Sequence, residues 1–288
     1  MRDARSAWPR CSAEAVPAHF ALALAPLGFL ELDPPTLISV AGAAGFRFVT
    51  LRTAPAVPGG VHYPLWPGSS ELREAAARLD DTGVRVLQVE LVSLHRETDV
   101  PGVRPLLESG AELGATRLVV SGDDADLSVV SARLAEVAEL AAEYEITVDV
   151  EFMPFRELGT LGRALDVVAA VGRDGVAVMV DALHLARSGG GPTDVAAADP
   201  RRLRVLQICD APLAAPSPEL LATEAREGRL LPGAGALPLD ALLNAMPDDA
   251  VWAGEVPMSG SGLSPFERAQ AIFEATARLV ERRRQRPA

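Results

Sequence analysis

Four short segments of the chain each end in an oxygen-bearing side chain that could bind a hard metal ion. They are TVDVEFMP with Glu151, VAVMVDALH with Asp181, LRVLQICDAP with Gln207 and VWAGEVP with Glu255. In each segment, an apolar run typical of a buried strand stops at the polar residue. A parallel α/β barrel gathers its successive strand ends on one face. The sequence therefore predicts a site for one divalent cation on that face.

Strand-like and helix-like segments alternate from about residue 19 onwards. Eight apolar runs are candidate strands: 19–25, 46–52, 84–91, 117–122, 147–152, 176–182, 203–209 and 251–256. The candidate helices are 34–44, 70–83, 103–114, 127–145, 161–172, 194–199, 239–246 and 265–284. An eightfold alternation favours a closed barrel over an open doubly wound sheet. We therefore expect an α/β protein with a single (β/α)8 TIM barrel over residues 19–288, preceded by a flexible N-terminal tail, residues 1–18.

Composition and charge argue against several classes of protein. The 288 residues suit one barrel, and a net charge of −12 argues against a nucleic-acid partner. The apolar stretch 20–30 is too short to cross a membrane and is interrupted by Pro26 and Gly28. The two cysteines have no pairing pattern, which indicates a reducing compartment. We expect a cytoplasmic protein without a membrane or nucleic-acid partner, and the sequence leaves a homo-oligomer open.

The connection 211–237 is the longest in the chain and contains four prolines. Long connections in compact domains are often functional, and this one follows the strand that carries Gln207. We predict that it forms a loop covering the barrel mouth.

These residues resemble the xylose isomerase-like TIM-barrel family of sugar isomerases, epimerases and related dehydratases. The resemblance spans about residues 19–280, and its most specific parts are VDALHLARSGG (180–190), VLQICDA (205–211) and EVP (255–257). It implies that Glu151, Asp181, Gln207 and Glu255 bind one divalent metal, and that His184, three residues after Asp181, touches the substrate. Two departures stand out: many epimerases of the family have His where this chain has Gln207, and LPGAG here replaces a Pro-Gly-Glu-Gly motif.

The donor set itself predicts which metal binds and what the metal does. Three carboxylates crowded together are unfavourable without a cation, and four oxygen donors favour Mn²⁺ or Mg²⁺ over Zn²⁺. The cation would polarise a substrate carbonyl and stabilise an enediolate. Glu151 and Glu255 could then remove and return a proton at the neighbouring carbon. His184 could donate to a substrate hydroxyl or act as an acid, or it could pack as a neutral residue.

Other polar residues follow the second and third strands. Arg52 and Glu90 could bind substrate at the barrel mouth, although a salt bridge between them is equally compatible with the sequence. His62 is a further candidate for substrate binding or an ordinary surface residue, and nearby Trp66 could pack over a sugar ring or simply pack in a loop.

The sequence thus predicts a divalent-metal-dependent isomerase or epimerase acting on a small sugar, polyol or keto-acid. The main alternative is a lyase that dehydrates a cyclic keto-acid or keto-polyol such as dehydroshikimate or an inosose. A barrel that only binds a ligand without catalysis is a further alternative, against which the intact donor set argues. The DNA-repair endonuclease branch of the family is disfavoured by four histidines in total and by the acidic charge.

Overall fold

The computed structural model describes residues 22–285 and shows a closed barrel of eight parallel strands in sequential order. The strands are β1 (Leu22–Leu24), β2 (Phe48–Arg52), β3 (Arg85–Leu94), β4 (Arg117–Gly122), β5 (Thr147–Glu151), β6 (Val176–Asp181), β7 (Leu203–Ile208) and β8 (Val251–Gly254). β1 pairs with both β2 and β8, which closes the barrel. The prediction of a single TIM barrel is therefore confirmed. The tail 1–18 and Cys11 lie outside the described residues.

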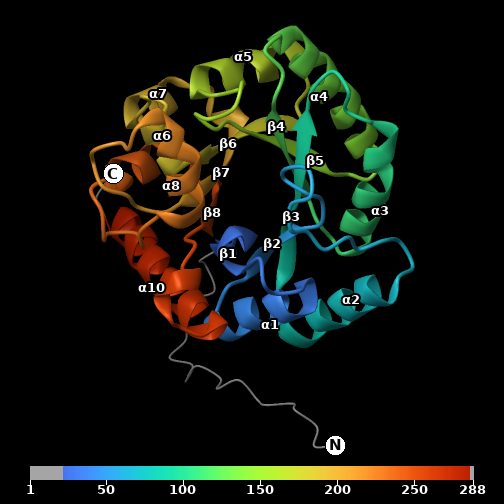
Figure 1. Ribbon diagram of the computed structural model, residues 1–288, viewed down its shortest axis with the longest axis horizontal. Helices are drawn as coiled ribbons and strands as arrows, with labels where there is room; N and C mark the ends of the chain where they lie inside the picture. Colours follow the sequence, from blue (N-terminus) through green and yellow to red (C-terminus); the bar gives the residue numbers. More distant parts are fainter. Residues whose placement is uncertain (1–21, 286–288) are drawn as a thin grey trace, which may run out of the picture.

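The helices form an outer ring around the strands (Figure 1). The α-helices are α1 (Pro34–Ala44), α2 (Ser70–Thr82), α3 (Arg104–Glu112), α4 (Leu127–Ala142), α5 (Leu161–Val171), α6 (Ala182–Arg187), α7 (Pro192–Ala197), α8 (Leu221–Glu227), α9 (Leu239–Ala245) and α10 (Pro265–Arg284). Short 3₁₀ helices cover η1 (Pro26–Phe29), η2 (Pro101–Val103), η3 (Pro200–Arg202), η4 (Pro218–Leu220) and η5 (Ser259–Ser261). No helix within residues 22–285 is long and apolar enough to cross a membrane.

Local signals explain several of the helix ends. α1, α2 and α5 each stop at a glycine with left-handed backbone, Gly45, Gly83 and Gly172. α10 begins with a capping box, in which Ser264 accepts a hydrogen bond from the Glu267 backbone and Glu267 bonds back to Ser264. The glycines therefore define where α1, α2 and α5 end, and the capping box defines where α10 begins.

Two apolar clusters hold the barrel together. The larger one lies between the strands and the surrounding helices and includes Leu24, Val120 and Ile208. The smaller one comes chiefly from residues of the strands themselves, among them Val119 and Met179. Side chains that fill the interior in this way make the barrel a packed core rather than a pore. Function is therefore left to the loops and strand ends.

Two helices were not expected from the sequence. The prediction that 211–237 is a plain loop is wrong, because the segment contains η4 and the seven-residue helix α8. The six-residue helix α6 follows β6 directly, and the Asp181 side chain caps it by accepting a hydrogen bond from the His184 backbone at 2.9 Å. Both helices span two turns or fewer, too short for a clear apolar period.

Candidate active site

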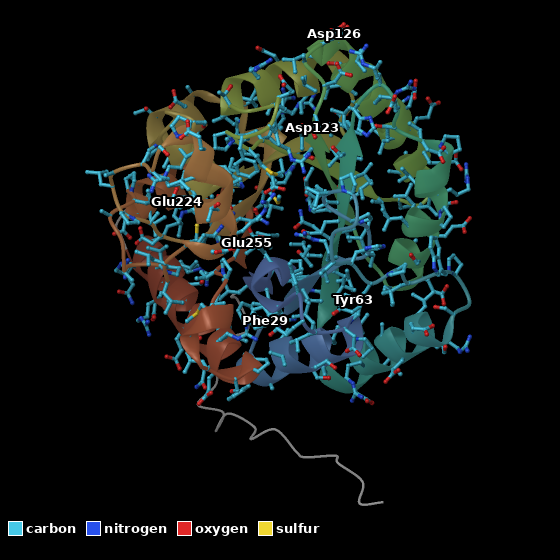
Figure 2. The ribbon with its side chains drawn as sticks, in the orientation of Figure 1. Phe29, Tyr63, Asp123, Asp126, Glu224 and Glu255 are labelled. Atoms are coloured by element: carbon cyan, nitrogen blue, oxygen red, sulfur yellow. The ribbon has the colours of Figure 1, made fainter. Side chains whose placement is uncertain are left out.

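The four predicted metal ligands lie at the C-terminal ends of four consecutive strands. Glu151, Asp181 and Gln207 are in β5, β6 and β7, and Glu255 directly follows β8. Their side chains are almost fully buried, with no residue more than 8% exposed. Glu255 lies inside the ring of helices, whereas Asp126, at the start of α4, lies at its outer edge (Figure 2). All four therefore stand at the strand ends that the sequence analysis named, on one face of the barrel.

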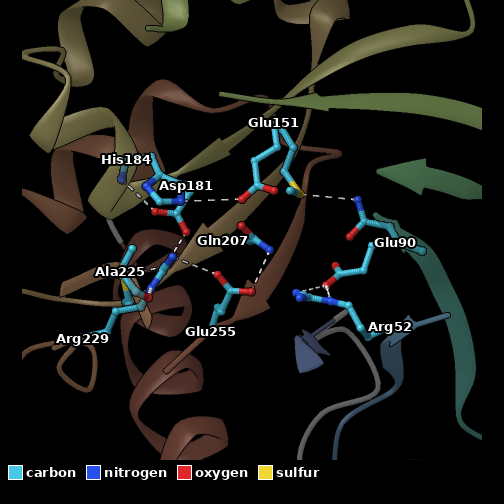
Figure 3. A network of polar contacts seen from close by, with 12 residues as sticks. Arg52, Glu90, Glu151, Asp181, His184, Gln207, Ala225, Arg229 and Glu255 are labelled. Carbon is cyan, nitrogen blue, oxygen red and sulfur yellow. Dashed lines mark hydrogen bonds and ion pairs between the residues drawn. The ribbon is translucent and has the colours of Figure 1, made fainter. Parts of the chain in front are cut away.

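An arginine that the sequence analysis missed lies among these residues. Arg229 Nη1 is 2.5 Å from Asp181 Oδ2, and its Nη2 is 3.1 Å from Glu255 Oε2 (Figure 3). Its Nε donates to the Ala225 carbonyl of α8 at 2.7 Å. Arg229 is 5% exposed, so the guanidinium is a built-in cation between two carboxylates. A charged residue between Gly228 and two leucines, just before a Pro-Gly turn, is the signal that could have indicated it.

Burial and neighbouring charges shift the pKa values of the three carboxyl groups in different directions. Burial, together with the charges of Glu255 and Asp181, raises the pKa of Glu151 well above its usual value. Burial also raises the pKa of Glu255 to about 7, against the lowering effect of Arg229. Burial alone would raise the pKa of Asp181, but interactions with Arg229, and with His184 including its backbone hydrogen bond, outweigh burial and lower that pKa. Without a further cation, these shifts favour the ionised form of Asp181 and the protonated form of Glu151.

The residue types fit a divalent cation. Three ionised carboxylates and Arg229 together carry −3 + 1 = −2, which one divalent ion neutralises. Gln207 Nε2 donates to Glu255 Oε1 at 3.2 Å, while its Oε1 is buried and has no hydrogen-bond partner. Burying an unpaired amide oxygen is unfavourable, so this atom is suited to bind a cation.

The four predicted ligands nevertheless do not surround a common position that a metal ion could occupy. Among the residues that the structure describes, no group of three or more His, Cys, Asp or Glu side chains is arranged to hold a metal ion. Asp181 and Glu255 instead face Arg229. Cation binding at these four donors stays a prediction.

His184 lies against Glu151 and is neutral. Its Nε2 is 3.8 Å from Glu151 Oε1, and its ring meets that of Phe155 edge-on at 5.5 Å. Burial lowers the pKa of His184 to about 4, and Nδ1 is buried without a partner. At neutral pH this imidazole can donate or accept a hydrogen bond, but it is not a charged acid.

The residues predicted at the second and third strands form an ion pair. Arg52 Nη2 lies 2.5 Å from Glu90 Oε1, and Nε donates to the same oxygen at 2.8 Å. The salt bridge that the sequence left open is therefore present. Both side chains also line the central cavity, so their role in substrate binding stays a prediction.

The central cavity has a volume of about 410 Å³. Its lining includes Glu151, His184, Gln207, Arg229 and Glu255, together with the Arg52–Glu90 pair. Asp181 lies behind them, fully buried, and reaches the site through Arg229. The structure thus brings together seven of the eight predicted residues. His62 is the exception, because it lines a neighbouring cavity and its Nδ1 lies 2.9 Å from the Gly60 carbonyl oxygen.

The segment 211–237 forms one wall of this cavity. Ala225, Arg226, Glu227 and Arg229 line it, which agrees with a position at the barrel mouth. Arg187 of α6 binds Glu224 of α8 at 2.7 Å with both side chains largely buried. This buried ion pair ties the segment to the barrel.

Asp210 fixes the LPGAG turn of the same segment. Its two oxygens accept hydrogen bonds from the backbones of Ala211, Gly233 and Leu237. A Cβ at Gly235 would meet Asp210 Oδ1 and the Ala211 carbonyl at 2.4 Å, so only glycine fits there. Asp210 itself is buried, as is the neighbouring Cys209, which lies in the apolar core.

Comparison with known proteins places this barrel in a family. The family model described as the xylose isomerase-like TIM barrel matches residues 38–256. The chain belongs to this family. Among curated proteins, an inosose isomerase of Halalkalibacterium halodurans is 32% identical over 115 residues, which are 39% of this chain and 39% of that relative. The chain therefore matches about two fifths of the length of this curated relative.

Solved structures share the xylose isomerase-like fold over nearly the whole chain. The crystal structure of the IolI protein with a bound zinc atom has a TM-score of 0.75 and 21% identity, and covers 91% of this chain and 99% of that one. A probable 3-DHS dehydratase, AsbF of Bacillus anthracis, has a TM-score of 0.72 and 15% identity, with coverages of 91% and 99%. At these identities the likeness concerns the fold.

Proposed function

We propose that this protein is a divalent-metal-dependent isomerase or epimerase that transfers a proton at the carbon next to the carbonyl of a small sugar or polyol. The observation that carries the proposal is the convergence of Glu151, Gln207, Arg229 and Glu255 on one cavity, with Asp181 behind them. The partial match to inosose isomerases supports a cyclic or sugar-like substrate.

Glu151, Asp181, Gln207 and Glu255 would hold the cation. The all-oxygen donor set favours Mn²⁺ or Mg²⁺, whereas the solved relative contains zinc. When bound, such an ion polarises the substrate carbonyl and offsets negative charge that develops on its oxygen. Arg229 supplies the remaining positive charge through Asp181 and Glu255.

Two carboxyl groups on separate strands would move the proton. Glu151 receives no hydrogen bond from another side chain of the site, so its ionised form can accept the proton from carbon. The pKa of about 7 makes Glu255 able to give or take a proton near neutral pH. Neutral His184 would orient a substrate hydroxyl beside Glu151.

A lyase that dehydrates a cyclic keto-acid or keto-polyol is the second candidate function. The likeness of the whole fold to a probable 3-DHS dehydratase keeps it open. His184, with its pKa lowered to about 4, does not supply the acid that departure of a hydroxyl group needs, so in a lyase Glu255 would have to supply it.

A product screen tests both functions. Metal-free protein reloaded with Mn²⁺ or Mg²⁺ is incubated with ketoses, inososes and dehydro-acids, and products are followed by proton nuclear magnetic resonance. We expect isomers or epimers without new ultraviolet absorbance. A new conjugated enone band would instead assign the dehydratase activity, and the absence of any product with any metal would contradict both.

A further inference from the structure

A second cavity, larger than the first, adjoins the central one. It has a volume of about 580 Å³ and lies between the 53–66 connection, the end of β3 and helix α3. Ala56, Val57, Leu91 and Arg156 line both cavities, so the two share a wall. None of the four predicted metal ligands lines the second cavity.

Much of the lining of the second cavity is apolar. Trp66 lines it and is 58% exposed, an unusual state for a large aromatic side chain. Pro58, Pro64 and Pro105 add rigid apolar surfaces, and Leu106 contributes from α3. Such a lining favours a planar apolar group, since aromatic rings stack on tryptophan and proline faces.

The charges of the second cavity exclude an anionic group. Glu97, Asp99 and Asp123 line it, and the one arginine of its lining, Arg156, is already paired with Asp123 at 2.8 Å. A phosphate or carboxylate would meet more negative than positive charge there. The same carboxylates could accept hydrogen bonds from hydroxyl groups of a neutral ligand.

Size points to a ligand that fills both cavities. Pockets for drug-sized ligands measure roughly 300–1,000 Å³. The central cavity alone, at about 410 Å³, accommodates a single sugar ring. The second cavity then remains for a further part of the same molecule.

We propose that the second cavity binds a neutral aromatic substituent on the sugar or polyol, so that the preferred substrate is an aryl conjugate rather than a free sugar. This inference rests on the proposed function, because it takes the sugar part to lie in the central cavity. Trp66 and Leu106 hold the aromatic ring, and His62 lies beside it as a hydrogen-bonding group.

Calorimetric titration with two probes tests the inference without any turnover. The probes are phenyl β-D-glucopyranoside and methyl β-D-glucopyranoside, which share the sugar and differ in the substituent. We expect the phenyl glycoside to bind at least about tenfold more tightly, the effect of about 1.4 kcal/mol. Equal dissociation constants would overturn the proposal and leave the cavity to another occupant, such as a peptide or a second copy of the chain.

Two pairs of variants test whether the tighter binding of the phenyl glycoside arises in the second cavity. Leu106→Trp fills the cavity and should remove the preference for the phenyl glycoside, whereas Leu263→Trp, at a 41% exposed position outside both cavities, should keep it. Trp66→Ala should weaken phenyl binding only, and Leu213→Ala, at a 75% exposed position, is its control. A preference that survives both cavity variants would overturn the proposal.

The outcome is separable from that of the proposed function. Proton exchange on unsubstituted ketoses and inososes reports the chemistry of the central cavity, and the phenyl preference reports the second one. Exchange without a phenyl preference would leave the proposed function standing and overturn this inference. A phenyl preference without exchange on any sugar, free or aryl-conjugated, would leave this inference standing and overturn the proposed function.

Discussion

Arg229 and Asp181 form a fully buried ion pair at the mouth of the barrel, with Nη1 2.5 Å from Oδ2 and neither side chain more than 1% exposed. They lie 48 residues apart in the chain, at opposite ends of the segment that includes α6, β7 and α8. Because the guanidinium also reaches Glu255, one side chain of the 211–237 segment neutralises part of the charge of the predicted metal site.

Replacing Arg229 should therefore destabilise the metal-free protein strongly. Arg229→Met leaves Asp181 buried and uncompensated, and breaking a buried pair in this way costs about 3–5 kcal/mol of the free energy of unfolding. Urea denaturation with a chelator present measures this loss in the free energy of unfolding. Arg226→Met, in the same segment but exposed, is the control and should change the free energy little. Equal effects of the two variants would mean that the pair does not stabilise the site.

The stability of the metal-free protein should fall as the pH rises towards 7. The pKa of Glu255 is raised from an ordinary 4.5 to about 7, so its protonated form is favoured by folding. That contribution is complete below pH 4.5 and is lost as the pH rises through about 7, by up to about 1.4 kcal/mol per pH unit for one proton. The raised pKa of Glu151 acts in the same direction.

Denaturation at pH 5, 6 and 7 with a chelator measures this loss. Glu255→Gln, which cannot ionise, should flatten the dependence. The lowered pKa of Asp181 acts in the opposite direction, but only below its ordinary value of 3.8, outside this window. Equal changes of stability between pH 5 and 7 in the wild type and in Glu255→Gln would contradict the assignment.

Much of this site could be predicted from the sequence because strand ends are local features. The runs before Glu151, Asp181 and Gln207 are apolar enough to indicate buried strands. The parallel barrel then brings the C-terminal ends of these strands together on one face. Arg229 could not be placed in the same way, since its partners are distant in sequence and α8 has too few turns to show a period. Likewise, the position of His62 beside the second cavity depends on the path of a connection without regular structure.

Changing Gln207 should alter which metal binds. Gln207→His replaces the unpartnered amide oxygen by an imidazole nitrogen, a softer donor, so preference should shift from Mn²⁺ or Mg²⁺ towards Zn²⁺. Thermal unfolding with each metal in turn measures this order of preference, because a ligand that binds only the folded state raises the melting temperature. An unchanged order of metals would place Gln207 outside the ligand set.

Glu151 should be needed for proton transfer rather than for folding. Glu151→Gln keeps an oxygen donor but removes the base, so turnover should fall about 10²–10⁴-fold while metal binding persists. The metal-free fold should hardly change, because Gln is nearly isosteric with Glu and the raised pKa of Glu151 already favours its uncharged form. Steady-state kinetics and calorimetric metal titration of the same preparation separate the two effects. Loss of metal binding together with turnover would make Glu151 mainly a ligand.

The most direct measurement is solvent deuterium exchange at the carbon next to the carbonyl of a ketose or inosose, followed by nuclear magnetic resonance. The wild-type protein is compared in a chelator and after reloading with Mn²⁺ or Mg²⁺. If the carboxylates at the barrel mouth transfer a proton with the help of a divalent cation, deuterium should enter the substrate only after reloading, and Glu151→Gln should abolish most of that exchange. Exchange that proceeds equally in the chelator, or that is absent with every metal and substrate, would contradict the account.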